Sequence, residues 1–218
     1  MNLFRENKLF TVAWFGFILS CLIIVFSGKQ GDGIRFFSEN RSFFGDGIFA
    51  YGTKMGEEIA YLVLVVLMLF VGYGKALMVG LTGLIVTICS YPLKMYFSHP
   101  RPKLFFKKLG ELDQLNLVEG VELHSQYTSF PSGHTMSAFA LYGLMSFIFR
   151  KHWKWQLVFF ACALIVATSR VYLVQHFVKD VLLGAVIGYL IAFLMYKLLE
   201  VLERRKVFLK NLVSVIKK

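Results

Sequence analysis

Two histidines and one aspartate are the side chains of this sequence with the clearest potential for chemistry. His176 precedes Asp180 by four residues, a spacing that puts both on one face of a helix, where the carboxylate can accept from an imidazole nitrogen. The other nitrogen of His176 is then free to attack phosphorus. His134, from a different segment, is available to protonate the departing oxygen and later to activate water. We predict His176 as nucleophile, Asp180 as its orienting group and His134 as the acid and base.

Three cations and a turn of small residues accompany these groups. Lys94, Arg101 and Arg170 can surround one phosphoryl group, because guanidinium forks match phosphate oxygens in pairs. Gly133 permits close backbone approach at an expected helix start, where free N–H groups and the helix dipole favour anions. Ser132 can either cap that helix or donate its hydroxyl to phosphate. We predict that these five residues bind phosphate, and we expect no metal or other cofactor.

Composition indicates that a membrane positions these residues. The chain has 218 residues, of which 57% are hydrophobic and 17% are charged, too apolar for an ordinary soluble domain. Helices of roughly 20 residues cross the hydrocarbon layer. Six stretches without Lys, Arg, Asp or Glu approach that length: 9–27, 59–74, 76–93, 132–149, 155–169 and 181–196. The expected fold class is all-α, a polytopic membrane protein with a bundle of six transmembrane helices.

Alternation of these spans gathers the reactive residues at one membrane face. Lys94 follows the third span, His134 opens the fourth, Arg170 closes the fifth and Asp180 opens the sixth. Ends of odd spans and starts of even spans lie on the same side. Ionisable groups cost at least roughly 2.5 to 3.5 kcal/mol each at the membrane centre and usually mark function. The sequence therefore predicts an active site at one face of the bundle.

The distribution of positive charge predicts the orientation and the partners. Six spans put both termini on one side, which holds 13 of the 24 Lys and Arg residues. Three of the other eleven belong to the predicted site, so the rule of positive cytoplasmic loops places the termini in the cytoplasm. Lys and Arg lie between apolar runs, which favours membrane lipids and not nucleic acid as partners. We divide the chain into a six-span domain, 1–199, and a basic amphipathic cytoplasmic tail, 200–218, with a solvated helical extension as the alternative for the tail.

At these residues the sequence resembles the type 2 phosphatidic acid phosphatase family. The family pattern is K-x6-R-P, then P-S-G-H, then S-R-x5-H-x3-D. The chain matches every position, as Lys94-x6-Arg101-Pro102, Pro131-Ser132-Gly133-His134 and Ser169-Arg170-x5-His176-x3-Asp180. The resemblance implies metal-independent dephosphorylation of a lipid phosphate or diphosphate, with His176, Asp180 and His134 in the roles given above. It also implies a bacterial inner-membrane enzyme whose active site faces the periplasm.

The long segment between the first two motifs is expected to rim the pocket and to set the headgroup preference. Lys103, Lys107 and Lys108, with the basic first loop, favour a multiply charged headgroup such as lipid A or undecaprenyl diphosphate. Phosphatidylglycerol phosphate is a further candidate. Two other functions fit the same pocket: a lipid phosphotransferase, and a non-enzymatic anion-binding membrane protein. A zinc site built from His134, His176 and Asp180 is a third alternative, although nearby cations would repel a divalent ion.

Overall fold

The computed structural model describes residues 7–216, with side chains placed for residues 7–205. Every regular element in that range is helical, which confirms the all-α prediction. In chain order the elements are α2 (Lys8–Ser27), α3 (Asp32–Glu39), α4 (Phe43–Gly52), η1 (Thr53–Gly56), α5 (Glu58–Leu69), α6 (Tyr73–Phe97), α7 (Pro102–Leu109), η2 (Leu112–Gln114), α8 (Gly133–Ile148), α9 (Trp153–Tyr172) and α10 (Val178–Ile216).

Six of these helices lie where the apolar stretches predict them, namely α2, α5, α6, α8, α9 and α10. Within the described range, four segments are long and apolar enough to cross a membrane: Lys8–Ser27, Tyr73–Leu109, Trp153–Tyr172 and Val178–Arg205. The other two helices are shorter, with 12 residues in α5 and 16 in α8. The chain is thus a membrane protein by composition and length, and the count of six crossings stays a prediction.

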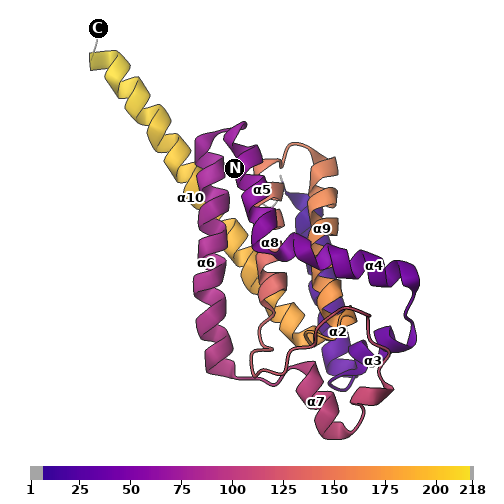
Figure 1. Ribbon diagram of the computed structural model, residues 1–218. Helices are drawn as coiled ribbons and strands as arrows, with labels where there is room; N and C mark the ends of the chain where they lie inside the picture. The colour runs from indigo at the N-terminus through magenta and orange to yellow at the C-terminus, as the bar shows by residue number, and fades with distance from the viewer. Residues whose placement is uncertain (1–6, 217–218) are drawn as a thin grey trace.

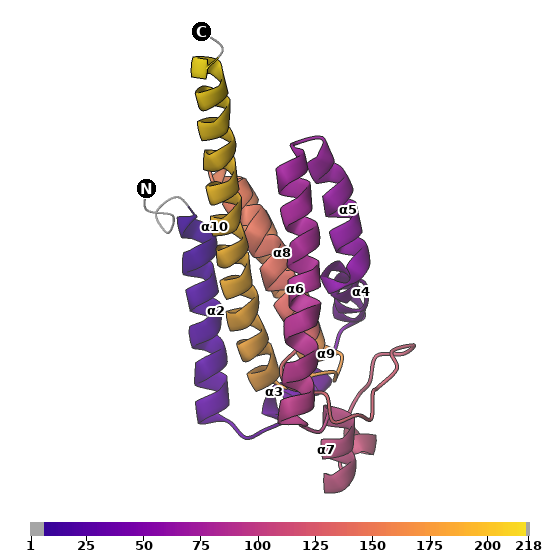
Figure 2. The same cartoon turned by 90° about the vertical axis from the view of Figure 1, so that its left-hand side faces the viewer.

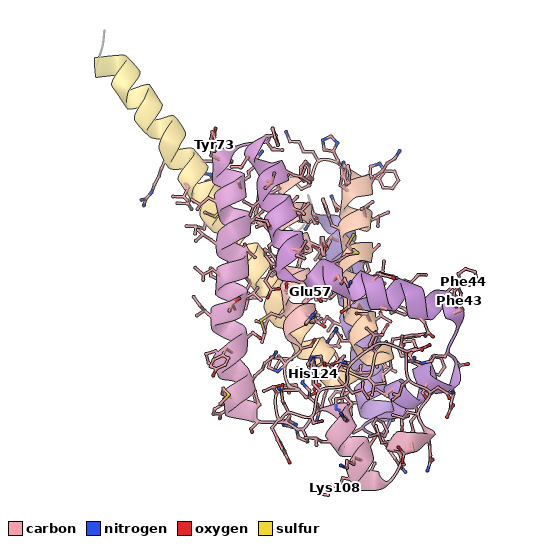
Figure 3. All side chains as sticks on the ribbon, viewed as in Figure 1. Phe43, Phe44, Glu57, Tyr73, Lys108 and His124 are labelled. Carbon is pink, nitrogen blue, oxygen red and sulfur yellow. The ribbon has the colours of Figure 1, made fainter. Side chains whose placement is uncertain are left out.

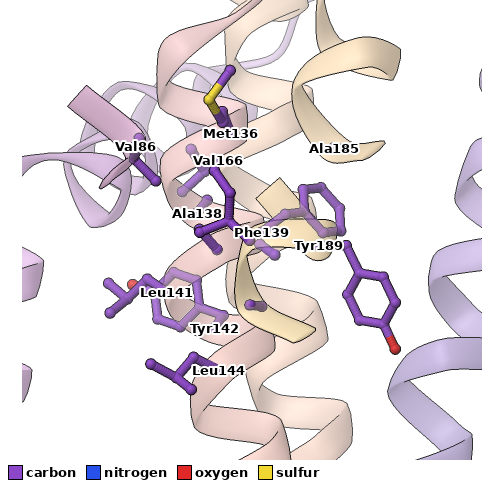
Figure 4. Packing of buried hydrophobic residues seen from close by; sticks show 14 of the residues in the cluster. Val86, Met136, Ala138, Phe139, Leu141, Tyr142, Leu144, Val166, Ala185 and Tyr189 are labelled. Carbon is purple, nitrogen blue, oxygen red and sulfur yellow. The ribbon is translucent and has the colours of Figure 1, made fainter. Parts of the chain in front are cut away.

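Helix α8 is the centre of the bundle, with α6, α9 and α10 packed around it (Figure 1). Every residue from Thr135 to Phe147 is buried. Figure 4 shows Phe139 and Leu141 of α8 in the same apolar cluster as Val166 of α9 and Tyr189 of α10. The outer helices expose large apolar side chains instead, as expected for surfaces that meet lipid.

Glycines allow α8 and α10 to approach closely. A Cβ atom on Gly184 of α10 would lie 2.6 Å from the carbonyl oxygen of Ser132, and one on Gly188 would collide with the carbonyl oxygen of Met136. Small residues four apart are typical of tightly packed membrane helices. The backbone N–H of Ser132 donates to the carbonyl oxygen of Asp180 at 3.0 Å. This packing joins the second and third sequence motifs.

The first loop, residues 28–58, forms two short helices and a 3-10 turn, although its glycines are typical of open turns. Gly31 has a φ of 101° and caps α3, but the Gly45-Asp46-Gly47 segment is helical. The hydroxyl of Tyr172 donates to a carboxylate oxygen of Asp46 at 2.6 Å, and a Cβ on Gly45 would lie 2.7 Å from that hydroxyl. Glycine is therefore needed for close packing of α4 on α9 and not for a turn. Phe43 and Phe44 lie at the outer end of α4, away from the bundle (Figure 3).

The start of α2 and the end of α10 lie at the same end of the molecule, opposite α3 and α7 (Figure 2). Helix α10 continues without interruption past residue 199, so no break in the backbone marks the predicted boundary of the tail. The apolar positions that predict an amphipathic tail, such as Phe208, Leu212 and Val215, lie outside the described side chains. The tail's contact with lipid stays a prediction.

Candidate active site

The eight predicted site residues lie at helix ends that meet at the α3 and α7 end of the bundle. Lys94 is in the last turn of α6 and Arg101 is the residue before α7. Ser132 caps α8, Arg170 is in the last turn of α9 and Asp180 is in the first turn of α10. A Cβ atom on Gly133 would lie 3.0 Å from Nζ of Lys94, and the backbone N–H of Ser132 donates to the carbonyl oxygen of Asp180. The structure therefore brings the three motifs together.

His176 and Asp180 form a fully buried pair. Nδ1 of His176 lies 3.4 Å from Oδ2 of Asp180, and the two side chains are 1% and 0% exposed. Nδ1 of His176 forms no hydrogen bond within the described residues. Asp180 Oδ2 instead accepts from the hydroxyl of Ser129 at 2.5 Å and from the N–H of Phe177 at 2.9 Å. The carboxylate is thus fixed beside the imidazole, and Nε2 of His176 is turned away from it.

The prediction that both residues lie on one helix is right for Asp180 and wrong for His176. Helix α10 begins at Val178, so His176 lies in the short connection from α9, where Val174 has a φ of 58°. A positive φ is unusual for a β-branched residue and marks a backbone held by its surroundings. Burial lowers the pKa of His176, and the adjacent Asp180 acts in the opposite direction. A neutral imidazole, the form that can act as a nucleophile, is thereby favoured.

Two buried arginines provide the core of the predicted phosphate cradle. Nη1 of Arg101 donates to the side chain and the carbonyl oxygen of Gln175 at 3.3 and 3.4 Å. Nη1 of Arg170 donates to the hydroxyl of Thr53 at 2.6 Å, while its Nε has no hydrogen-bond partner among the described residues. An unpaired buried donor is costly unless a ligand satisfies it. The orientation of both side chains is thus fixed while donor capacity is left for an anion.

The glycine and serine of the second motif have separate structural roles. A Cβ atom on Gly133 would lie 3.0 Å from Nζ of Lys94 and 3.1 Å from the hydroxyl of Ser90, so a larger residue would displace these side chains by a few tenths of an ångström. The hydroxyl of Ser132 accepts from the N–H of Thr135 at 3.4 Å and bonds to the Thr135 hydroxyl at 2.9 Å. Of the two roles predicted for Ser132, the helix cap is the one this structure contains. Donation to phosphate stays a prediction.

Four further residues contact the site, and the motifs did not indicate them. Ser129 and Gln175 hold Asp180 and Arg101, as described above. Thr53 accepts from Arg170, and Oε1 of Glu57 lies 3.6 Å from Nε2 of His134. Thr53 and Glu57 come from the segment between the first two predicted spans, residues 28–58. The only sequence signal for Glu57 was a carboxylate at the start of an apolar run, which is also a common way to begin a helix.

A cavity of about 530 Å³ opens beside His134 between α5, α6 and α8. Its lining includes polar and apolar residues, among them Tyr61, Gly80, Gly83, Ser90, Lys94 and His134. The side chain of His134 is 34% exposed. The predicted acid and base, His134, therefore faces open space, whereas the predicted nucleophile is enclosed.

The segment predicted to rim the pocket is held by hydrogen bonds from Gln175, the partner of Arg101, and from Lys103. Gln175 donates to the carbonyl oxygen of Glu122 at 2.9 Å, and Lys103 donates to that of Leu123 at 3.1 Å. His124 follows directly, and partial burial together with the charge of Arg101 lowers its pKa. Figure 3 shows His124 near this end of the bundle and Lys108 at the far tip of α7. In this rim, His124 therefore lies within range of the charges of Arg101, Arg170 and Lys103.

The arginines of the basic first loop have other contacts. Arg35 forms ion pairs with Glu111 at 2.7 Å and Asp32 at 2.9 Å. Arg41 donates to the carbonyl oxygen of Tyr172 at 2.9 Å. These arginines connect α3 and the α3–α4 turn to the rest of the protein. They give no direct support to the prediction that this loop selects the headgroup.

Metal ligation was a separate alternative for the two histidines and Asp180. In the part of the chain that the structure describes, no three His, Cys, Asp or Glu side chains are placed to hold one ion. The contacts of His176 and His134 are instead with one carboxylate each. Metal independence itself stays a prediction.

The fold and the site together define a class: an all-helical membrane protein with a histidine–carboxylate pair below a cluster of cations at one end of the bundle. The chain belongs to the PAP2 superfamily, which matches residues 75–204. The matched range holds all three motifs, the whole of α8 and α9, and most of α6 and α10. The family predicted from the motifs is therefore confirmed.

Curated relatives and solved structures agree with this assignment. Undecaprenyl-diphosphatase BcrC of Bacillus subtilis (strain 168) is 28% identical over 161 residues, which cover 72% of this chain and 77% of that protein. Phosphatidylglycerophosphatase B of the same strain is 37% identical over 90 residues, 38% of this chain and 44% of that one. The predicted class of enzyme, a phosphatase, agrees with both names.

Two crystal structures share the fold. LpxE from Aquifex aeolicus has a TM-score of 0.64 at 24% identity, with 75% of this chain and 92% of that chain covered. A transmembrane PAP2-type phosphatidylglycerolphosphate phosphatase from Bacillus subtilis has a TM-score of 0.63 at 23% identity, with 88% and 96% covered. The Bacillus relatives and the apolar helices together support a bacterial membrane protein.

Proposed function

We propose that this chain is a membrane lipid phosphatase that hydrolyses a lipid phosphomonoester or diphosphate through a phosphohistidine at His176, without a metal. The observation that carries the proposal is the fully buried His176–Asp180 pair, with Arg101 and Arg170 close enough to act on the same imidazole. The cations would hold the charge that spreads over a transferring phosphoryl group, the main requirement for this reaction.

In the first step Nε2 of His176 attacks phosphorus, and the bond from phosphorus to the lipid oxygen breaks. That oxygen receives a proton from His134 and leaves as the lipid alcohol, or as the lipid monophosphate when the substrate is a diphosphate. Lys94, Arg101 and Arg170 hold the phosphoryl oxygens, together with free N–H groups at the start of α8. Asp180 stabilises the positive charge that develops on His176.

In the second step water attacks the phosphohistidine. His134, now neutral, takes a proton from this water, and the bond between phosphorus and nitrogen breaks to release inorganic phosphate. The partial exposure of His134 fits this role, because the same residue must meet both the leaving lipid and the incoming water. The turnover returns both histidines to their starting protonation states.

Two of the relatives suggest the substrates to test first. One is named for undecaprenyl diphosphate and one for phosphatidylglycerophosphate. Lipid A is added because Lys103, two residues from Arg101 in the rim, would suit a multiply charged headgroup. The ends of the described chain lie opposite the site (Figure 2), so cytoplasmic termini would put the site at the periplasmic face.

Phosphate release by the purified protein tests the proposal. Undecaprenyl diphosphate, lipid A, phosphatidylglycerol phosphate and phosphatidic acid are compared with and without a chelator, and His176→Asn serves as the inactive control. We expect release from at least one lipid, insensitive to the chelator and lost in the variant. Release that requires a second lipid as acceptor would indicate a phosphotransferase. Unchanged release by a folded His176→Asn protein would overturn the proposal.

A further inference from the structure

The short turn η1 approaches the active site from outside the three motifs. Ser137 of α8 donates to the carbonyl oxygen of Gly56 at 2.7 Å, and Tyr142 donates to that of Met55 at 2.9 Å. These bonds fix the turn against the central helix. Its first residue, Thr53, accepts from Arg170, and Glu57, which follows its last residue, contacts His134. The turn thus reaches a predicted phosphate ligand and the predicted acid at once.

Positively charged side chains from three other elements lie near His134. Arg170 comes from α9, Lys94 from α6 and Arg101 from the start of α7, and His176 lies in the α9–α10 connection. A general acid must carry its proton when the substrate arrives, and neighbouring cations oppose that. Oε1 of Glu57, 3.6 Å from Nε2, supplies negative charge at close range. No other carboxylate among the described residues forms an ion pair with His134.

We propose that Glu57 is a positioning residue for His134. Its carboxylate turns Nε2 toward itself, leaves Nδ1 for the lipid oxygen and stabilises the protonated imidazole before the first step. The proposal rests on the proposed function, because it assigns Glu57 a task only if His134 protonates a leaving group. It gives the acid the kind of support that Asp180 gives the nucleophile.

The position of Glu57 suits a group that is used reversibly. Its side chain is 36% exposed beside the cavity that His134 also lines. His134 gives up a proton in the first step and takes one in the second. A partner in contact with water can stabilise the charged form without making the proton too hard to transfer. Figure 3 shows Glu57 at the start of α5, above His124 and inside the outline of the bundle.

The leaving group provides a direct test. An alkyl lipid phosphate requires protonation of its departing oxygen, whereas p-nitrophenyl phosphate releases a stable anion and does not. For Glu57→Gln we expect kcat/KM to fall about 30-fold on the lipid and about 3-fold or less on the aryl ester, within the range of general acid catalysis. Glu57→Asp should recover part of the loss. Glu39→Gln, which removes an exposed carboxylate at the end of α3, is the matched control and should leave both values unchanged.

A double-mutant cycle with His134→Ala separates this role from a structural one. In the His134→Ala background, Glu57→Gln should cause no further loss on the lipid. Equal losses on the two substrates, or an undiminished effect in that background, would overturn the proposal. The wild-type rates are read first, because failure of the wild type to release phosphate from either substrate contradicts the proposed function and not the assignment of Glu57 alone.

Discussion

The two histidines of the site each face a carboxylate, and their surroundings differ sharply. The contact distances are similar, 3.4 Å for His176 and Asp180 and 3.6 Å for His134 and Glu57. The first pair is completely buried, whereas about a third of each side chain in the second pair is exposed. Asp180 is also held by Ser129 and Phe177. The molecule therefore has one rigid pair and one open pair within the same cluster of cations.

This difference corresponds to the two tasks of phosphoryl transfer. A nucleophile needs one fixed direction of attack, and burial gives that direction and keeps the imidazole neutral. An acid that also serves as a base must exchange protons with substrate and water, which requires access. In the proposed mechanism, a histidine and a carboxylate thus perform different tasks according to how far they are buried. The variants below test that interpretation in order of expected effect.

Removing the charge of the buried pair should have the larger effect. We expect Asp180→Asn to lower kcat/KM by about 10³-fold, since a neutral amide cannot stabilise the imidazolium and can present an N–H to Nδ1. Phosphate release on the best lipid substrate measures this, with thermal unfolding as the check on folding. A loss in kcat/KM no greater than that of Glu57→Gln would show that the buried pair contributes no more to the reaction than the exposed pair.

Arg170 is the cation that links the buried pair to the η1 turn. In the wild type, Nη1 of Arg170 donates to Thr53, and Nε has no partner in the described residues and can donate to substrate. Arg170→Lys keeps the positive charge but replaces these two separate donors with one ammonium group. We expect a loss of about 100-fold in kcat/KM, because lysine cannot provide both bonds. Thr53→Val, which removes only the acceptor, should cost about 5-fold on the scale of one hydrogen bond. Similar losses for the two variants would mean that Arg170 matters mainly through the turn.

Ser129 tests how far the rigidity of the first pair depends on one hydroxyl. Ser129→Ala removes the bond to Asp180 Oδ2 but leaves the N–H of Phe177 in place. We expect kcat to fall about 10-fold, as for a lost hydrogen bond to a charged group, with KM little changed. Steady-state kinetics on a single lipid provides both values. An effect confined to KM would assign Ser129 to binding and not to the orientation of the pair.

The smallest expected effect concerns His124, a histidine at the rim without a close carboxylate contact in the described residues. Partial burial and Arg101 lower its pKa in the folded protein, so below its ordinary pKa of about 6.5 the unfolded chain binds the proton more readily. The wild type should therefore lose stability as the pH falls from about 7 to about 5, and His124→Gln should lose slightly less. Thermal unfolding across that range measures both. An equal fall in the stability of the two proteins would contradict a lowered pKa of His124 in the folded state.

Much of the site was predictable because the motifs fix residue types and alternation of the spans fixes the side. Lys94, His134, Arg170 and Asp180 come together as the sequence predicted, since each stands at the end of an apolar stretch. The pairing of His176 with Asp180 also followed from their spacing, although His176 lies before the helix and not on it.

The contacts from outside the motifs could not be predicted. Glu57 and Thr53 reach the site only because η1 folds back onto α8 through Ser137 and Tyr142, an arrangement set by tertiary packing. The Gly45-Asp46-Gly47 sequence is typical of a turn, but Gly45 lies in a helix and provides room for the Tyr172 hydroxyl. Such close approaches depend on helices distant in the chain, which local patterns do not contain.

Trapping the phosphorylated enzyme tests most directly whether His176 is the nucleophile. Wild-type protein is mixed with a substrate labelled in its phosphoryl group, quenched in alkali, which preserves phosphohistidine, and digested for mapping. We predict label on the peptide that contains His176, absent in His176→Asn and increased in His134→Ala when p-nitrophenyl phosphate is the substrate. An active wild-type enzyme that never carries label, or label that remains in His176→Asn, would contradict the assignment of the buried histidine as nucleophile.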